Sequence, residues 1–189
     1  MRKIDKYATE MIPIRLIISI TVIAAISLMI CFGYMHLKVV LAENQMENEC
    51  EALESELLSL LASGVSRDVN ENDVGSGTMR IHSFNLPDNL VFLGIGVDPD
   101  INNDGNYETG LTEDGTVIFY KIDGGSKKVL WLDESFRFRE GIYDGDKWIT
   151  NDNQGYILID SGKYVLTFEL VEKFHEKYIL IQANDGIEL

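Results

Sequence analysis

Twenty consecutive residues without a charged side chain, from Leu16 to Met35, constrain the fold more than any other part of this sequence. As a helix with a rise of ~1.5 Å per residue, the run measures about 30 Å, which is the thickness of the hydrocarbon core of a bilayer. The run is too long for the apolar region of a cleaved secretory signal, and no small-residue cleavage site follows it. We therefore predict an uncleaved transmembrane helix at residues 16–35, preceded by a basic tail at residues 1–15.

Charge is distributed unevenly around this apolar run. Up to Val40 the chain has five basic and two acidic side chains, whereas the remainder has 11 basic and 29 acidic ones, and the net charge of the whole chain is -15. The positive-inside rule then predicts a cytoplasmic N-terminus and an extracellular C-terminal domain in the cell membrane. Because the acidic outer part has no basic surface to neutralise phosphates, we expect no nucleic-acid partner.

The helical pattern continues beyond the apolar run into an amphipathic segment at residues 36–62. Its apolar side chains recur at steps of three and four residues, and they are Met46, Cys50, Leu53, Leu57 and Leu60. Glutamates occupy the other faces, so we predict a stalk helix continuous with the membrane span. An apolar stripe of this kind has to be covered. The cover is either the chain's own outer domain or a second copy of the helix in a self-associated form.

The two cysteines, Cys31 and Cys50, cannot pair with each other within one chain. They lie 19 residues apart on the same expected helix, which corresponds to about 28 Å at helical rise, whereas a disulfide needs Cα atoms closer than ~7 Å. The outer domain therefore has no disulfide framework. We interpret Cys50 as a small apolar residue on a packed helix face, with a disulfide between two chains as the alternative.

A linker is expected at residues 63–77, because Ser63-Gly64 is a helix stop and the following residues are rich in Asn, Asp, Ser and Gly. From Thr78 onward the apolar period changes to two, and turn dipeptides separate short aromatic or β-branched segments. The predicted strands are residues 78–86, 90–97, 116–122, 128–132, 136–139, 156–159, 164–171 and 178–183. Strand 116–122 is apolar on both faces, so we expect it to be central and to lie beneath the amphipathic helix.

These elements predict an α+β fold, in which a long N-terminal helix, first transmembrane and then amphipathic, precedes an antiparallel β-sandwich-like domain at residues 78–189. Short strands with no helical interval between them favour this architecture.

The most specific chemical signal is the segment DPDINNDGNYE at residues 98–108. Oxygen-bearing side chains alternate along it and a glycine follows, as in the first half of an EF-hand-type calcium loop. We predict a calcium site whose ligands are Asp98, Asp100, Asn102, Asp104, Asn106 and Glu108. The twelfth position of the loop is Leu111 instead of the usual glutamate, and no helix is expected after it. A loop held by Asx and glycine turns without an ion is the alternative.

Candidates for catalysis are few. His82 and His175 are the histidines beyond the membrane region, each in a strand-like sequence context, and no serine or cysteine lies in a nucleophile motif. The acidic pairs Asp133-Glu134 and Asp144-x-Asp146 have the residue types of a glycosidase couple, but carboxylates are so frequent here that chance explains them. We therefore expect no enzymatic activity, with an envelope hydrolase as a minor alternative.

Three aromatic side chains are candidates for recognition of carbohydrate or protein, namely Trp131, Tyr143 and Trp148. As strand residues of a small β domain they are expected mainly in the core. Exposure of the rings would instead favour a surface module that binds glycan or another envelope component.

The order of basic tail, hydrophobic helix, amphipathic stalk and disulfide-free β domain resembles the type IV pilin-like proteins of archaea. The segment EMIPIRL at residues 10–16, the loop at residues 98–105 and the segment GGSKK at residues 124–128 are similar to small uncharacterised surface proteins of methanogenic and related archaea. This resemblance implies a cell-surface protein with a structural or interaction role. Its partners would be the membrane and, as a filament subunit, other copies of the chain; a standing anchor is the alternative.

Overall fold

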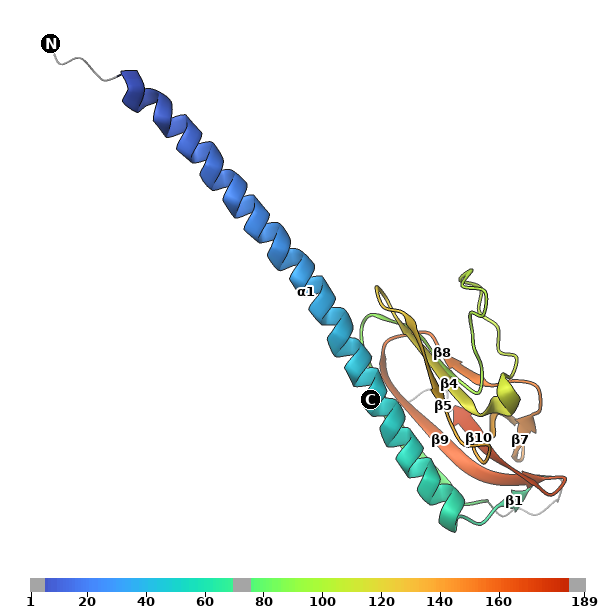
Figure 1. Ribbon diagram of the computed structural model, residues 1–189. Helices are drawn as coiled ribbons and strands as arrows, with labels where there is room; N and C mark the ends of the chain where they lie inside the picture. The colour runs from blue at the N-terminus through green and yellow to red at the C-terminus, as the bar shows by residue number, and fades with distance from the viewer. Residues whose placement is uncertain (1–5, 70–75, 184–189) are drawn as a thin grey trace. The chain divides into compact units, whose positions relative to one another are not determined.

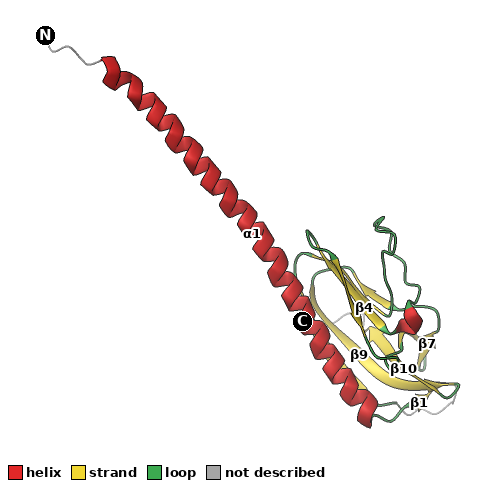
Figure 2. Cartoon of the chain, in the orientation of Figure 1, coloured by secondary structure: helices red, strands yellow, loops and turns green. Residues whose placement is uncertain are grey.

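The structure is a computed structural model that describes residues 6–69 and 76–183. It contains one long helix followed by a mostly antiparallel β domain, which confirms the predicted α+β class (Figures 1 and 2). The chain divides into two compact units, Met1–Val40 and Leu41–Leu189.

Helix α1 spans Lys6–Ser63 and crosses the boundary between the two units. It begins inside the predicted tail and ends one residue beyond the predicted stalk, so the expected continuous helix is confirmed. The helix stops where the N–H of Gly64 donates to the carbonyl oxygen of Leu60 over 2.7 Å. A Cβ at Gly64 would lie 2.3 Å from that same oxygen, so only glycine fits this stop.

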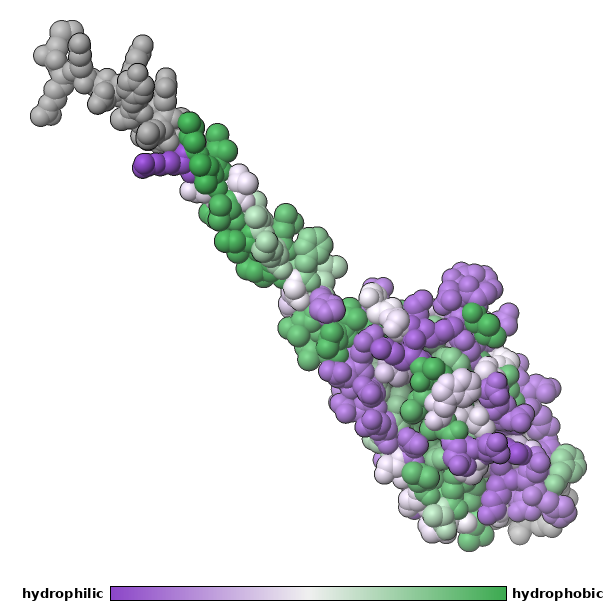
Figure 3. Space-filling model, in the orientation of Figure 1, coloured by the Kyte–Doolittle hydropathy of each residue, from purple (hydrophilic) through white to green (hydrophobic). Residues whose placement is uncertain are grey.

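In the first unit, α1 has the length and composition of a membrane-spanning helix. Every side chain from Ile14 to Lys38 is exposed. Figure 3 shows the resulting surface as largely hydrophobic. A helix that is apolar on all sides needs apolar surroundings, and a bilayer provides them. These properties are consistent with the predicted membrane anchor.

The second unit places its strands in two sheets. The described strands are β1 Arg67–Asp68, β2 Met79–Leu86, β3 Leu90–Ile95, β4 Val117–Ile122, β5 Lys127–Trp131, β6 Phe138–Tyr143, β7 Trp148–Asn151, β8 Tyr156–Leu158, β9 Gly162–Lys173 and β10 Glu176–Ala183. The larger sheet has the order β1-β9-β10-β6-β7, with β2 also paired to β9, and the smaller sheet has the order β5-β4-β3-β8. Pairing is antiparallel except between β1 and β9 and between β10 and β6.

Most predicted strands are present with ends shifted by at most two residues, but three predictions are corrected. The strand expected at residues 136–139 is displaced to Phe138–Tyr143, because the N–H of Phe136 closes a turn onto the carbonyl oxygen of Asp133. Strand β7 was not predicted. The expected linker contains β1 and the buried side chain of Val69, while its residues 70–75 lie outside the described part of the chain.

Large apolar side chains from both sheets form the core, among them Phe84, Phe92, Phe138 and Phe168. Strand β4 lies between β3 and β5 and is buried along nearly its whole length, which confirms its predicted central position. The C-terminal half of α1 completes this core, because its five apolar stripe residues are at most 2% exposed. Of the two covers expected for the stripe, the chain's own domain is the one present.

A buried ion pair connects three strands of the larger sheet. Nε of Arg67 in β1 lies 2.8 Å from Oε1 of Glu169 in β9, and Glu169 is only 1% exposed. Gln182 in β10 donates to the other carboxylate oxygen of Glu169 over 2.7 Å. A buried carboxylate with a charged partner and further donors is satisfied, so this group has a structural role.

The packed face of α1 predicts a contrast between two neighbouring leucines. Leu57 is fully buried and Leu58 is about half exposed. We expect Leu57→Ala to lower the free energy of unfolding by about 2–5 kcal/mol, since it leaves a cavity, whereas Leu58→Ala should change it by less than about 0.5 kcal/mol. Urea unfolding of the full chain in detergent, followed by tryptophan fluorescence, measures both. Equal effects would contradict the burial of the stripe.

Candidate functional site

The predicted calcium loop follows β3 and begins with two buried carboxylates. Asp98 and Asp100 are buried, whereas residues 101–108 are exposed. Nζ of Lys127 in β5 lies 2.8 Å from a carboxylate oxygen of Asp98 and donates to the carbonyl oxygen of Asp100 over the same distance. The first carboxylate of the proposed shell therefore already has a cationic partner from the neighbouring hairpin.

The next ligands form a series of Asx turns. Asp100 accepts the N–H of Gly105 over 3.3 Å, Asn102 accepts that of Asp104 over 3.2 Å, and Asp104 accepts that of Asn106 over 2.7 Å. The hydrogen bond from the Asn106 backbone lowers the pKa of Asp104 below its ordinary value. Positive φ at Asn103 and Gly105 makes the sharp bend. The sequence-predicted residues from 100 to 106 are thus brought into one turn.

Glu108 closes the base of this loop through its backbone, whose N–H donates to the carbonyl oxygen of Pro99 over 2.9 Å. Within residues 6–69 and 76–183, no three His, Cys, Asp or Glu side chains form a cluster with metal-ligand geometry. Calcium also takes amide, carbonyl and water oxygens. The predicted calcium site therefore stays a prediction.

The core interpretation of the aromatic residues is wrong for two of the three. Trp131 is 59% exposed and Tyr143 is 57% exposed, whereas Trp148 is partly buried against a cluster formed by Val69, Val171 and Leu180. The rings of Tyr143 and Trp148 lie side by side on the β6–β7 hairpin, with centroids 5.5 Å apart. Trp131 belongs to β5, at the edge of the other sheet.

His82 is buried between β2 and α1. Its Nδ1 lies 3.1 Å from Oε2 of Glu56, and its Nε2 lies 3.7 Å from Oε2 of Glu49. The ring also packs edge to face on Phe84, with centroids 4.4 Å apart. A general base needs access to a substrate proton, and this ring is enclosed by its own helix and sheet.

His175 lies in the turn between β9 and β10, in the interval that separates the predicted strands 164–171 and 178–183. Phe174 and His175 both have positive φ, which the two-residue turn of this hairpin requires. The side chain of His175 is fully exposed, and its Nδ1 lies 3.6 Å from a carboxylate oxygen of Glu172.

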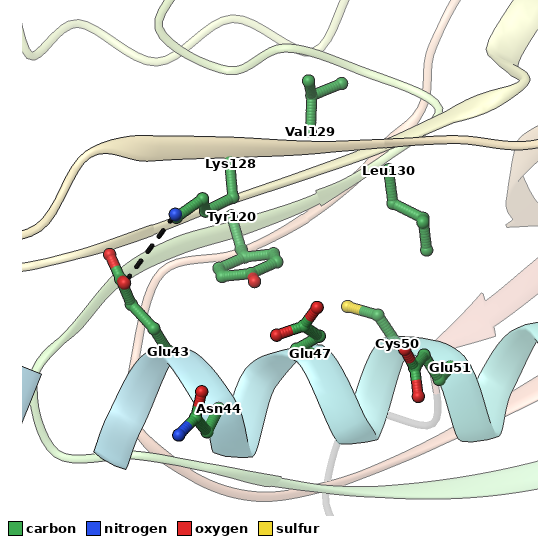
Figure 4. Close-up of a pocket in the computed structure, with 9 residues that line it drawn as sticks. All are labelled: Glu43, Asn44, Glu47, Cys50, Glu51, Tyr120, Lys128, Val129 and Leu130. Carbon is green, nitrogen blue, oxygen red and sulfur yellow. Dashed lines mark ion pairs between the residues drawn. The ribbon is translucent and has the colours of Figure 1, made fainter. Parts of the chain in front are cut away.

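A cavity of about 280 Å³ between α1 and strands β4 and β5 was missed by the sequence analysis. Its lining residues are Glu43, Asn44, Glu47, Cys50, Glu51, Tyr120, Lys128, Val129 and Leu130. Figure 4 shows the three glutamates on successive turns of the helix, with Tyr120 opposite them. Lys128 and Leu130 point from β5 toward the helix and Val129 points away, as strand alternation requires.

Two protonated groups lie deep in this cavity. Burial raises the pKa of the Cys50 thiol to about 12, and the neighbouring Glu49 adds to the effect. Burial likewise raises the pKa of Tyr120 to about 12, with a contribution from Cys50. At neutral pH the cavity therefore contains a neutral thiol and a neutral phenol beside the glutamates. The four-residue spacing of these glutamates was visible in the sequence, but the strands that face them were not.

No protein-family model, no curated protein and no solved structure matches this chain. The resemblance to archaeal pilin-like proteins therefore stays a hypothesis based on the residues quoted for it.

The buried state of Cys50 predicts slow alkylation of its thiol. In a Cys31→Ser chain, we expect iodoacetamide at pH 8 to modify Cys50 at least about ten times more slowly in the native protein than in urea, because the thiolate is the nucleophile. Mass spectrometry measures the rate. A cysteine introduced by Ser55→Cys into a chain without native cysteines is the exposed control on the same helix. Equal rates for Cys50 and this control would contradict the prediction.

Proposed function

We propose that this protein is a single-pass membrane protein of the cell surface, pilin-like in build, with a structural or interaction role. The observation that carries the proposal is a change in the surface of α1 along its length. The segment from Ile14 to Lys38 is apolar and exposed on all sides, whereas the segment from Leu41 to Ser63 is amphipathic and packs on a folded domain. The first property suits lipid and the second suits an aqueous compartment.

The orientation in this proposal follows from charge. Basic side chains prevail before the span, and acidic ones prevail after it. The positive-inside rule favours retention of the basic end in the cytoplasm, so the β domain is extracellular. Cys31 and Cys50 are both free thiols, and the domain is held by its apolar core and by the Arg67–Glu169 pair instead of by disulfides.

A standing anchor and a filament subunit are two forms of this proposal. The amphipathic stripe of α1 is already buried by the chain's own domain, so self-association of the intact domain would have to use another surface. In a filament, the apolar segment at residues 16–35 would pack against other copies instead of lipid.

Exposed aromatic rings favour a second function, the binding of glycan or another envelope component. Trp131 and Tyr143 present more than half of their surface to solvent. Flat aromatic faces stack on the apolar faces of sugar rings, and aromatic side chains are frequent at protein interfaces. Tyr143 and Trp148 place two rings next to each other, with centroids 5.5 Å apart.

Calcium is proposed as a stabilising ion of the loop at residues 98–108. Support comes from the Asx turns, which gather the oxygens of Asp100, Asn102, Asp104 and Asn106 into one bend. Extracellular modules often bind calcium at ~0.1–1 mM, so a weak site would be occupied outside a cell.

The orientation predicts which positions are accessible from outside. In a chain without native cysteines, a cysteine introduced by Ser126→Cys in the β4–β5 turn should react with a membrane-impermeant maleimide on intact cells, since this residue is exposed. A cysteine introduced by Lys3→Cys should react only after lysis. The label on each variant is read by gel shift. The reverse labelling pattern would refute an extracellular domain.

The calcium proposal predicts a rise in thermal stability. For a dissociation constant of ~1 mM, 10 mM calcium contributes about 1.4 kcal/mol, which raises the Tm of a domain of this size by several degrees. Circular dichroism of the full chain in detergent measures the shift. Asp104→Asn should abolish it, while Asp160→Asn, at an exposed position outside the loop, should keep it. An unchanged midpoint in the unaltered chain would refute the site.

A further inference from the structure

The side chain of Arg139 in β6 is buried and has no negatively charged partner. It is only 9% exposed, and none of the ion pairs among residues 6–69 and 76–183 includes it. Burial of the charged form lowers the pKa of Arg139 below its ordinary value. A buried charge without a counterion costs free energy, so an anion at this position would stabilise the protein.

Three of the five N–H groups of Arg139 have no acceptor among the described residues. Nη1 donates to the carbonyl oxygen of Asp114 over 2.7 Å and to that of Phe138 over 2.8 Å. Nε and Nη2 have no hydrogen bond to the described part of the chain, yet neither atom is fully enclosed. The edge formed by Nε and Nη2 therefore reaches the surface. This is an edge on which a guanidinium binds two oxygens of a carboxylate or phosphate group.

Arg67 shows which group occupies such an edge elsewhere in the same domain. Its side chain is also 9% exposed. Its Nε and Nη2 donate to the two carboxylate oxygens of Glu169 over 2.8 Å and 3.0 Å. The two arginines thus have the same burial and the same type of edge, but only Arg67 has a carboxylate from its own chain. The matching occupant for Arg139 is a group with two adjacent anionic oxygens.

The surroundings of Arg139 hold its guanidinium in a fixed orientation. The angle φ is positive at three consecutive residues, Glu113, Asp114 and Gly115, which is unfavourable for the first two. This turn directs the carbonyl oxygen of Asp114 at Nη1, and a Cβ at Gly115 would lie 2.8 Å from the same nitrogen. The guanidinium carbon lies 4.8 Å from the ring centroid of Tyr178. A group fixed in this way loses little freedom when it binds a ligand.

Acidic side chains close to this guanidinium leave its free edge available. Glu176 is paired with Arg137 over 2.9 Å, and Asp152 is paired with Lys173. Asp114 is exposed, so water screens the charge of its carboxylate. Arg137 adds a second positive charge nearby.

We infer that Arg139 binds an oxyanion group, a carboxylate or a phosphate, of a ligand from outside this chain. Nε and Nη2 donate to two oxygens of the ligand, while Nη1 keeps its hydrogen bonds to the two backbone carbonyl oxygens. The ring of Tyr178 supports one face of the guanidinium. This anion site is independent of the structural role proposed above.

Nuclear magnetic resonance of the full chain in a neutral detergent tests the inference, because each arginine Nε–H gives its own signal. Sodium acetate and sodium phosphate are titrated separately against sodium chloride at constant ionic strength. We expect one of the two anions, or both, to shift the Arg139 signal in a saturable way, and the tighter of the two identifies the ligand group. The Arg67 signal should not move, because its edge is already occupied. Equal responses to chloride, shifts that do not saturate, or equal shifts at both arginines would overturn the proposal.

A pair of variants separates this edge from general attraction to positive charge. Arg139→Lys keeps the charge and removes the two adjacent donors, so it should weaken anion binding at least about tenfold. Arg80→Lys is the matched control in β2, which β9 and β10 separate from β6. The backbone N–H signal of Gly115 reports binding in each variant, and near-ultraviolet circular dichroism verifies the fold. Equal affinities in the two variants would refute the site, and the titration of the unaltered chain decides even where Arg139→Lys does not fold.

Discussion

Burial of the apolar stripe of α1 on the β domain is the contact on which the rest of this structure depends. Its five members, from Met46 to Leu60, are almost completely removed from solvent. Full burial of each such side chain contributes about 1.5–3 kcal/mol, whereas an isolated helix of this length is marginal in water. The benefit is mutual, because the helix covers His82 and Phe84 of β2 and the inner face of β4. Helix and sheets therefore form one cooperative unit.

The same contact determines which glutamates of α1 lie next to the sheets. Glutamates flank the buried stripe, so packing of α1 brings several carboxylates against the sheets. His82 faces two of them, and Lys128 faces a third. The sheets place no further cation opposite Glu47 and Glu51 within the described residues. Both of these side chains are exposed, so they lie on the solvated face of the helix that sequence periodicity predicted.

The spacing of apolar residues predicted those elements whose structure depends on local sequence. The helix, its stop at Gly64 and the central strand β4 follow directly from apolar spacing and from glycine chemistry. Strands β1 and β7 have two and four residues, and they exist because of pairing with β9 and β6, which no local pattern encodes. Trp131 is exposed because β5 forms the edge of its sheet. The cavity joins residues roughly 70 to 85 positions apart in sequence, so only the fold reveals it.

The loop at residues 98–108 and the cavity beside α1 are both acidic, but their carboxylates are stabilised in different ways. In the loop, Lys127 neutralises Asp98, and backbone N–H groups bind the carboxylates of Asp100 and Asp104. These donors already supply much of what a cation would supply. In the cavity, Glu47 and Glu51 receive no donor from the described residues, but both side chains are exposed to solvent. Water therefore solvates the unpaired carboxylates of the cavity, whereas the loop neutralises its buried carboxylates with donors of its own.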